Sequence, residues 1–193
     1  MTDLRAFIAI EINDPDVLRH IQKIQRELQA SRAKLKHVES ENLHFTLHFL
    51  GNIHTDQVTV LEEILNNLQG EPFEVGLVGL GSFRPQRPRV VWIGCSTGAE
   101  LLVQYQKLLG DQLRKNGFSV DKRRYSPHLT IARVKSGEYR EELMDLVRRH
   151  SNHDFGKFQV SAIKLKKSTL TPRGPIYEDL AVKEFREDDS KMK

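Results

Sequence analysis

Two histidines in this chain share a pattern of neighbours that could support acid–base chemistry. His44 lies in the run "LHFTLHFL", two residues before Thr46. His128 lies in the run "PHLTIARV", two residues before Thr130. Both runs are rich in residues that favour β-strands, and side chains at positions i and i+2 of a strand point to the same face. We therefore expect each histidine to project together with its threonine.

Two imidazoles that face one another suit one kind of chemistry. Near neutral pH one ring can be uncharged and accept a proton while the other is charged and donates one. A general acid or base of this type contributes a factor of about 10² to 10⁴ in rate. Threonine hydroxyls can donate hydrogen bonds to anionic oxygens. An acid, a base and two such donors, with no metal motif, indicate hydrolysis or group transfer at a phosphodiester.

Simpler explanations exist for each of these residues taken alone. A histidine in an apolar strand is often a hydrogen-bonded packing residue, and threonine is an ordinary β-branched strand former. The second copy of the motif favours the catalytic interpretation. His48 completes a His-x₃-His spacing with His44, but zinc enzymes of that type carry the pair on a helix with an intervening Glu. We expect no metal here, and we expect His48 to be structural or a weak substrate contact.

The apolar spacing along the chain predicts strands that alternate with amphipathic helices. Asp14 followed by Pro15 predicts the start of the first helix. The predicted strands cover residues 4–12, 43–50, 73–81, 89–95, 128–134, 158–168 and 175–185. The predicted helices cover about 15–30, the segment from Thr55 to Gly70, about 99–116 and about 138–150.

The same order of elements occurs twice along the chain. Three landmarks recur at nearly one offset: 84 residues between the two histidines, 85 between "FEV" at Phe73 and "FQV" at Phe158, and 83 between Phe7 and Val90. Internal repetition of this kind indicates two related segments. If an approximate two-fold axis relates the segments, both His-x-Thr pairs can converge on one cleft.

This repetition predicts the architecture. We expect an α+β fold of two pseudo-symmetric lobes around a central cleft. The lobes belong to a single domain of residues 1–185, followed by a charged tail of residues 186–193. Within the domain the repeats cover about 4–82 and 88–168, and residues 175–185 form a closing strand.

Composition describes a globular protein of 193 residues with 38% hydrophobic and 29% charged residues. No apolar run approaches the roughly 20 residues of a membrane helix, and the N-terminus lacks the pattern of a secretory signal. The single cysteine, Cys95, excludes an internal disulfide and a cysteine-based zinc site. We expect a cytoplasmic location, a monomer and no contact with a membrane.

Basic residues are concentrated in the second half of the chain. Residues 1–83 hold 7 Lys and Arg against 12 Asp and Glu, whereas residues 84–193 hold 23 against 14. Within residues 107–135 there are 8 basic and 2 acidic residues. Such clustering is typical of proteins that bind a polyanion or a phosphate, and a solvated basic face is the simpler alternative. The run "KLKK" at residues 164–167 has two similar interpretations, an RNA track or a solvated strand edge.

The paired "HFTL" and "HLTI" resemble the two HxTx motifs of the 2H phosphoesterase superfamily. More closely, the chain is similar to the RNA 2′,3′-cyclic phosphodiesterases, also called 2′-5′ RNA ligases. The segments that carry this resemblance are "RAFIAIEI", "ENLHFTLHFLG", "SPHLTIARV" and "LKKSTLTPRGPIYE". The resemblance runs from about Leu4 to Phe185, and two HxT copies in these contexts are far more specific than one.

The resemblance implies a bilobal α+β fold whose lobes of antiparallel sheet carry outer helices around the cleft. It implies hydrolysis of RNA 2′,3′-cyclic phosphate ends to a 2′-phosphate, with no cofactor. His128 would be the proton acceptor that activates water, and His44 the proton donor to the departing 3′ oxygen. Thr46 and Thr130 would hold the non-bridging phosphate oxygens, and Arg133 would neutralise charge near the phosphate or guide the RNA. The near-symmetry leaves the two histidine roles exchangeable.

Three alternative functions stay open from the sequence. The first is 2′-5′ ligation of RNA ends, with tRNA fragments among the substrates. The second is a cyclic phosphodiesterase that acts on small molecules. The third is a non-catalytic RNA-binding module on the same scaffold, against which the intact histidine pair argues, because binding needs basic residues but no matched acid and base.

Overall fold

The structure, a computed structural model, describes residues 3–172 and 174–186, so that all but the first residue of the predicted charged tail lies outside the described residues. The strands are β1 (Asp3–Glu11), β2 (Leu35–His37), β3 (His44–His54), β4 (Phe73–Gly81), β5 (Val90–Cys95), β6 (Leu129–Val134), β7 (Asp154–Val160), β8 (Ala162–Thr171) and β9 (Gly174–Glu184). The α-helices are α1 (Pro15–Leu28), α2 (Gln57–Asn66), α3 (Ala99–Lys115) and α4 (Arg140–Arg149). Two short 3₁₀ turns, η1 (Gln29–Ser31) and η2 (Ser40–Asn42), complete the elements.

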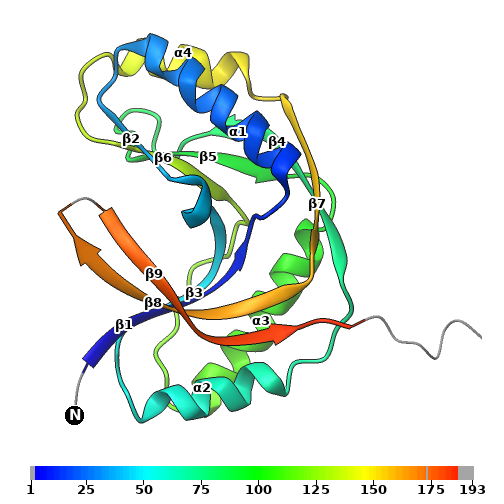
Figure 1. Cartoon of the computed structure of the whole chain (residues 1–193). Coiled ribbons are helices and arrows are strands. Elements are labelled where there is room, and N and C mark those ends of the chain that lie inside the picture. The colour runs from blue at the N-terminus through cyan, green and yellow to red at the C-terminus, as the bar shows by residue number, and fades with distance from the viewer. Residues whose placement is uncertain (1–2, 173, 187–193) are drawn as a thin grey trace, which may run out of the picture.

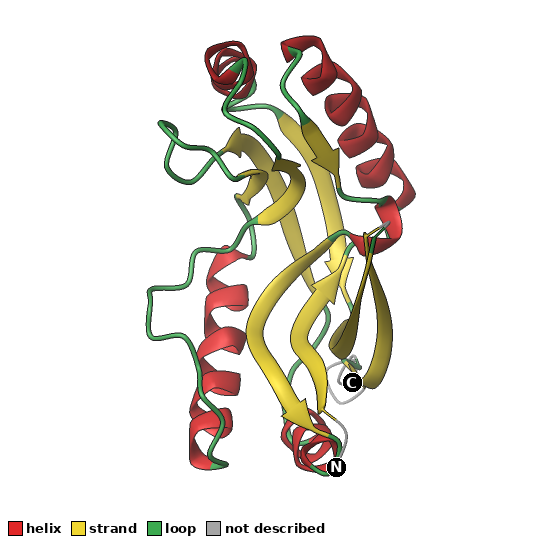
Figure 2. Ribbon diagram, turned by 90° about the vertical axis from the view of Figure 1, so that its left-hand side faces the viewer, coloured by secondary structure: helices red, strands yellow, loops and turns green. Residues whose placement is uncertain are grey.

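The strands form one curled antiparallel sheet in the order β7-β4-β5-β6-β3-β1-β8-β9, with β2 paired to β6 (Figure 1). Between β6 and β3 the register consists of a single residue pair, Phe45 with Leu129. The sheet thus divides there into two halves of four strands each, with β2 added to the half that contains β6. Helices α1 and α4 pack on the half that contains β4 to β7, and α2 and α3 pack on the half that contains β1, β3, β8 and β9 (Figures 1 and 2). The predicted α+β fold with antiparallel sheet and outer helices is confirmed.

Each half of the sheet is built from both sequence repeats. Strand β4 of the first repeat hydrogen-bonds with β5 and β7 of the second, and β8 of the second repeat hydrogen-bonds with β1 of the first. Helix α1 of the first repeat likewise packs on β6 and β7 of the second. The segments exchange elements, and the chain is therefore more closely interlocked than two consecutive lobes.

Among the three landmarks of the repeat, the "FEV" and "FQV" segments lie side by side in the sheet. "FEV" and "FQV" are direct neighbours, since Phe73 pairs with Val160 and Val75 pairs with Phe158 across β4 and β7. All four side chains are buried. The two segments look alike because both present alternate apolar side chains to the same core.

The predicted strand at 158–168 is two strands, β7 and β8, that separate at Ser161. The buried positions change phase there, from Phe158 and Val160 to Ile163 and Leu165. Because side chains alternate with a period of two, this change cannot occur within one regular strand. The three-residue strand β2 was not predicted, since it is too short to show a pattern.

The start of α1 follows the sequence prediction. The Asp14 carboxylate accepts hydrogen bonds from the backbone N–H groups of Asp16 and Val17 at 3.0 Å, with Pro15 at the first helical position.

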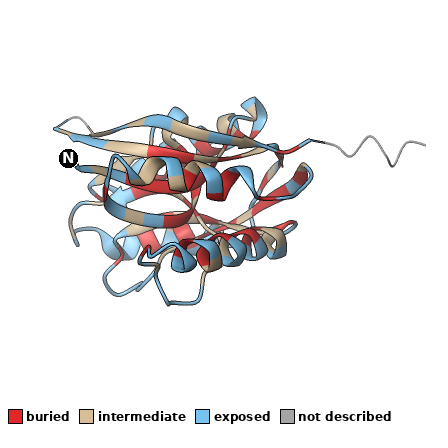
Figure 3. Ribbon diagram, turned by 90° about the horizontal axis from the view of Figure 1, so that it is seen from below, coloured by how far each residue is buried: buried red, intermediate tan, exposed pale blue. Residues whose placement is uncertain are grey.

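Figure 3 shows buried positions along the strands and on the helix faces turned toward them. No helix in the described part of the chain is long and apolar enough to cross a membrane.

Candidate active site

The contact between the two halves of the sheet places both His-x-Thr motifs on one surface. Phe45 of β3 pairs with Leu129 of β6, and both side chains are fully buried in the core. Neighbouring side chains on a strand point to the opposite face, so the residues that flank this pair point away from the core. These are His44 with Thr46 on β3 and, at the start of β6, Thr130 with His128, which directly precedes the strand; all four are only partly buried.

The antiparallel register also decides which side chains are neighbours. With Phe45 opposite Leu129, His44 lies across from Thr130, and Thr46 lies across from His128. Each histidine therefore lies between its own threonine along the strand and the other threonine across it. The sequence prediction that both pairs meet at one place agrees with this register.

A β-bulge follows each motif. The register of β3 against β1 skips Leu47, and the register of β6 against β5 skips Ile131. Both residues directly follow a motif threonine, and both are buried. A bulge bends and twists its strand and shifts the alternation of side chains by one place. After each motif two successive residues are therefore buried, Leu47 with His48 on β3 and Ile131 with Ala132 on β6.

The bulge at Leu47 explains the position of His48. Simple alternation would place His48 on the same face as His44, but the extra residue returns it to the core side, where it is 4% exposed. Its Nε2 lies 2.7 Å from the Gln106 carbonyl oxygen of α3. His48 is therefore a packing residue, which agrees with the structural role that is one of the two expected from the sequence.

The two motif histidines make matching hydrogen bonds to the backbone. His44 Nδ1 lies 2.7 Å from the Asn42 carbonyl oxygen, and His128 Nδ1 lies 2.8 Å from the Ser126 carbonyl oxygen. A carbonyl oxygen only accepts, so Nδ1 of each ring must carry the proton and donate it. Nε2 of each ring is then the atom that exchanges a proton with a substrate.

The surroundings of His44 are aromatic and partly closed. The Phe7 ring of β1 lies 5.0 Å from the His44 ring, and the Tyr177 ring of β9 meets it edge-on at 5.5 Å. Burial lowers the pKa of His44 to about 4, although the hydrogen bond to Asn42 acts in the opposite direction, and the Lys166 charge lowers it further. In the free protein at neutral pH, His44 is therefore uncharged.

An ionic network lies beside His44. Lys166 is buried and contacts the carboxylates of both Glu11 and Asp179, while Lys164 Nζ lies 2.5 Å from Glu11 Oε2 and 2.7 Å from Asp179 Oδ2. Glu11 is opposite His44 in the register of β1 and β3, so the network shares its face of the sheet. Burial alone would raise the pKa of both carboxyls, but the hydrogen bonds from the two lysines outweigh it and hold both pKa values low.

This network corrects one sequence expectation. The sequence predicts an RNA track or a solvated edge for the lysines at 164–167, yet Lys164 and Lys166 on β8 are both held by carboxylates of the neighbouring strands β1 and β9. Their charges are therefore balanced within the protein. No local sequence signal predicts this, because Glu11 and Lys166 are 155 residues apart.

The surroundings of His128 differ from those of His44. The Phe83 ring meets the His128 ring edge-on at 4.8 Å, and the Trp92 ring lies 6.4 Å away. Trp92 is opposite Thr130 in register and its ring covers Gly81, where a Cβ would lie only 2.2 Å from the indole. A partly exposed aromatic surface thus takes the place that the ionic network occupies beside His44.

Arg133 reaches the same region from the far end of β6. It is exposed and lies past the bulge, opposite Val90 of β5 and Lys36 of β2. Burial is the largest influence on the pKa of His44 and of Tyr177, and the Arg133 charge acts on both as well. The guanidinium is therefore close enough to the site to act on a bound anion.

The residues described here include no group of three or more His, Cys, Asp or Glu side chains that could hold a metal ion. Lone histidines elsewhere have local roles, such as His54, whose Nδ1 lies 2.6 Å from the Asp3 carboxylate.

The chain matches the family described as the AKAP7 2′5′ RNA ligase-like domain over residues 6–182. It is 40% identical over 182 residues to a Methanothermobacter thermautotrophicus protein, covering 93% of this chain and 97% of that protein. It is 39% identical over 180 residues to an Archaeoglobus fulgidus protein, covering 93% and 99%. Both relatives are named RNA 2′,3′-cyclic phosphodiesterase.

Two solved structures share the fold. The crystal structure of TT0787 of Thermus thermophilus superposes with a TM-score of 0.81 at 24% identity, covering 96% of this chain and all of the other. The apo crystal structure of LigT of Escherichia coli superposes with a TM-score of 0.79 at 21% identity, covering 97% of this chain and all of the other. At these identities the two likenesses concern the fold.

Proposed function

The chain belongs to the RNA 2′,3′-cyclic phosphodiesterase family of 2H phosphoesterases, and we propose that it opens terminal 2′,3′-cyclic phosphates on RNA to leave a 2′-phosphate. The observation that carries this proposal is the register of β3 and β6, which puts two backbone-anchored histidines and two threonines on one face. An acid, a base and two hydroxyl donors are what the reaction needs.

The proposed reaction is an attack of water on the cyclic phosphorus. His128 Nε2 accepts a proton from the water as its oxygen bonds to phosphorus. The bond from phosphorus to the 3′ oxygen breaks, and His44 Nε2 gives its proton to that oxygen. The products are a 2′-phosphomonoester and a free 3′-hydroxyl. The hydroxyls of Thr46 and Thr130 donate hydrogen bonds to the non-bridging oxygens, whose charge grows as the pentacoordinate transition state forms.

The low pKa of His44 sets a condition on this assignment. A proton donor must carry its proton when the substrate is bound, and His44 is uncharged in the free protein at neutral pH. A phosphate anion between the two rings favours the charged form of each. We propose that His44 takes up its proton together with the substrate. The exchanged assignment, with His44 as base, is the alternative that the pH profiles described below separate.

The proposed substrate is RNA, and tRNA fragments that end in a cyclic phosphate are one candidate. Arg133, exposed and close to the site, would act on the phosphate or the adjoining backbone. We also propose that the protein works as a monomer, because both histidines come from the same chain. The interlocked repeats support a single functional unit of residues 1–185. A cytoplasmic location is proposed on the single cysteine, Cys95, which can form no internal disulfide.

Ligation is the second candidate function, since the matched family is described as 2′5′ RNA ligase-like. In that reaction the 5′-hydroxyl of a second RNA replaces water, and the same proton transfers give a 2′-5′ linkage.

The test of the proposed function is product analysis with a short RNA that ends in a 2′,3′-cyclic phosphate, in the presence of a chelator. We expect an RNA with a 2′-phosphate and a 3′-hydroxyl, formed at the same rate with and without the chelator. A 3′-phosphate product, or no turnover of any cyclic phosphate, would overturn the proposal. A joined product on addition of a 5′-hydroxyl RNA would favour ligation.

A further inference from the structure

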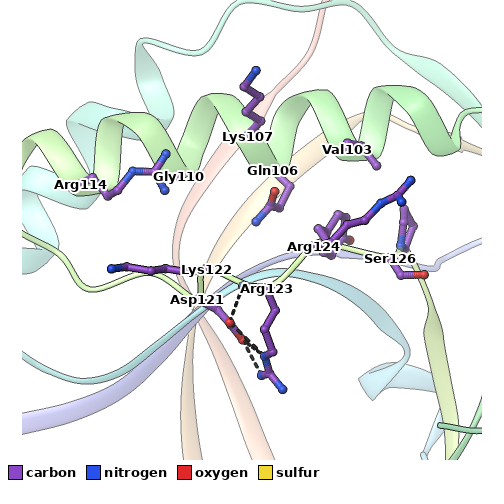
Figure 4. Close-up of a pocket in the computed structure, with 12 residues that line it drawn as sticks. Val103, Gln106, Lys107, Gly110, Arg114, Asp121, Lys122, Arg123, Arg124 and Ser126 are labelled. Carbon is purple, nitrogen blue, oxygen red and sulfur yellow. Dashed lines mark hydrogen bonds and ion pairs between the residues drawn. The ribbon is translucent and has the colours of Figure 1, made fainter.

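A groove of about 680 Å³ lies between α3 and the loop of residues 121–127 (Figure 4). It is separate from the His44 surroundings, and the mechanism above does not use it. Among the twelve residues that line it, one is acidic, Asp121, and five are basic. The basic residues are Lys107, Arg114, Lys122, Arg123 and Arg124.

Three of these five charges are not balanced locally. Arg123 pairs with Asp121, Nη2 to Oδ2 at 2.5 Å, and Arg114 pairs with Asp111 on its own helix. Lys107, Lys122 and Arg124 make no ion pair within the described part of the chain, and all three are exposed. In Figure 4 the Lys122 side chain extends along the groove, and Arg124 reaches toward its other end near Ser126. The groove therefore carries a net positive charge.

The cluster of basic residues noted in the sequence at 107–135 is thus gathered largely on one surface. This surface contrasts with the lysines beside His44. Lys164 and Lys166 are held by Glu11 and Asp179, so the charges of these two lysines are balanced within the protein.

The groove adjoins the His128 side of the site along the chain. Its wall ends with Ser126 and Pro127, and the next residue is His128. The Ser126 carbonyl accepts the hydrogen bond that orients the His128 ring. Seven residues, 121 to 127, separate the start of the loop from His128, so the whole wall lies within roughly 25 Å of it at full extension.

A ligand that occupies both the groove and the space between His44 and His128 must be an extended anion. A terminal cyclic phosphate between the two histidines leaves the rest of the RNA to run out of the site on one side. The His44 side is occupied by Phe7, Tyr177 and the charge-balanced network, whereas the His128 side leads to unpaired cations. Lys and Arg along a groove bind the phosphodiester backbone without regard to base sequence.

We propose that the groove between α3 and residues 121–127 binds the phosphodiester backbone of the RNA strand that ends in the cyclic phosphate. The inference rests on the proposed function and names a second subsite for the same substrate. It predicts that the protein prefers an oligonucleotide to a mononucleotide, and that this preference depends on salt and on the groove cations.

The test compares the binding of two probes, a 2′-phosphate-ended RNA pentamer and the corresponding nucleoside 2′-monophosphate, over a range of salt concentrations. The groove variant is Lys122→Ala with Arg124→Ala. The matched control is Lys23→Ala with Arg26→Ala, which removes the same charge from the exposed face of α1 on the other half of the sheet.

We expect wild type to bind the pentamer at least tenfold more tightly than the monophosphate. In the groove variant this ratio falls toward one, and the slope of log K against log salt for the pentamer decreases in magnitude by about 1.4, for two single-strand phosphate contacts at about 0.7 each. The control keeps the wild-type ratio and slope.

Three results would overturn the proposal: equal affinity of wild type for both probes, the same loss in the groove variant and the control, or an unchanged ratio in the groove variant because both probes weaken together. The third result would mean that the loop of residues 121–127 affects binding only by orienting the His128 ring, and not by contacting the RNA backbone. A parallel assay of a nucleoside 2′,3′-cyclic phosphate reports on the proposed function separately. In one outcome, wild type and the control variant hydrolyse this nucleotide while the ratio of pentamer affinity to monophosphate affinity does not behave as expected. That result would overturn the proposed RNA subsite in the groove but leave the proposed function intact.

Discussion

His44 and His128 make the same hydrogen bond, each from ring Nδ1 to the carbonyl oxygen two residues earlier, at 2.7 Å and 2.8 Å. The bonds anchor two rings that differ in their aromatic and charged neighbours. His44 is enclosed by aromatic rings beside a balanced ionic network, and His128 borders an exposed aromatic surface and a basic groove. The pseudo-symmetric backbone supplies two equivalent rings, and the unequal surroundings can make one an acid and the other a base.

The first prediction concerns the pKa of His44. Because burial lowers it, we expect an NMR titration of the free protein to give about 4 for this ring. A saturating nucleoside 2′-monophosphate should raise the value by about 1 to 3 units, since an anion nearby favours the charged form. The His44→Ala variant identifies the resonance. An unchanged titration with the ligand bound would remove His44 from contact with the phosphate.

The second prediction assigns the two roles. In His44→Ala the remaining ring is His128, and if His128 is the base the residual rate must rise with pH. In His128→Ala the remaining ring is His44, and if it is the acid the residual rate must fall as pH rises. Profiles of kcat for the two variants on one RNA substrate measure this. If the slope of kcat against pH has the opposite sign in both variants, His44 is the base and His128 is the acid.

The third prediction follows from the same pKa shift through linkage. The unfolded chain binds a proton on His44 below about pH 6.5, whereas the folded chain does not until about pH 4. The free energy of unfolding therefore has its full value, as far as His44 is concerned, above pH 6.5, and it decreases as the pH falls toward 4. Urea unfolding across this window should show a slope that is smaller in His44→Ala than in wild type by up to about 1.4 kcal/mol per pH unit. Identical slopes would mean that the folded His44 titrates normally.

The fourth prediction concerns Lys166, which is buried between two carboxylates. Lys166→Met leaves Glu11 and Asp179 with Lys164 alone, and we expect a loss of about 3 to 5 kcal/mol in the free energy of unfolding, as for other broken buried pairs. It should also raise the pKa of His44, because a nearby positive charge is removed. Lys167→Met, which removes a more exposed lysine from Glu178, is the control and should cost at most about 1 kcal/mol. Equal losses in the two variants would contradict the structural role of the network.

Local patterns in the sequence predict many of the residues and elements that form this site. The paired His-x-Thr motifs, their strands and the α1 cap at Asp14 each depend on residues a few places apart, where spacing alone fixes the geometry. The function class followed from the motif pair and from the family resemblance together.

What the sequence missed depends on register between distant segments. The exchange of β4 and β8 between repeats, the contact of Lys166 with Glu11, and the groove formed by α3 against residues 121–127 all join segments whose pairing no local pattern encodes. The bulges were missed for another reason. An extra residue such as Leu47 or Ile131 is apolar and compatible with a strand, so it looks like any other strand position until the register is known.

The most direct test of the account is the turnover of a short RNA ending in a 2′,3′-cyclic phosphate by wild type, His44→Ala and His128→Ala, with a chelator present. Near-UV circular dichroism shows whether each variant keeps the native packing. If the two rings are the acid and the base, each folded single variant loses at least about 10²-fold in kcat, while wild type is unaffected by the chelator. A folded variant of either histidine that retains turnover within a few-fold of wild type would contradict the acid–base pair.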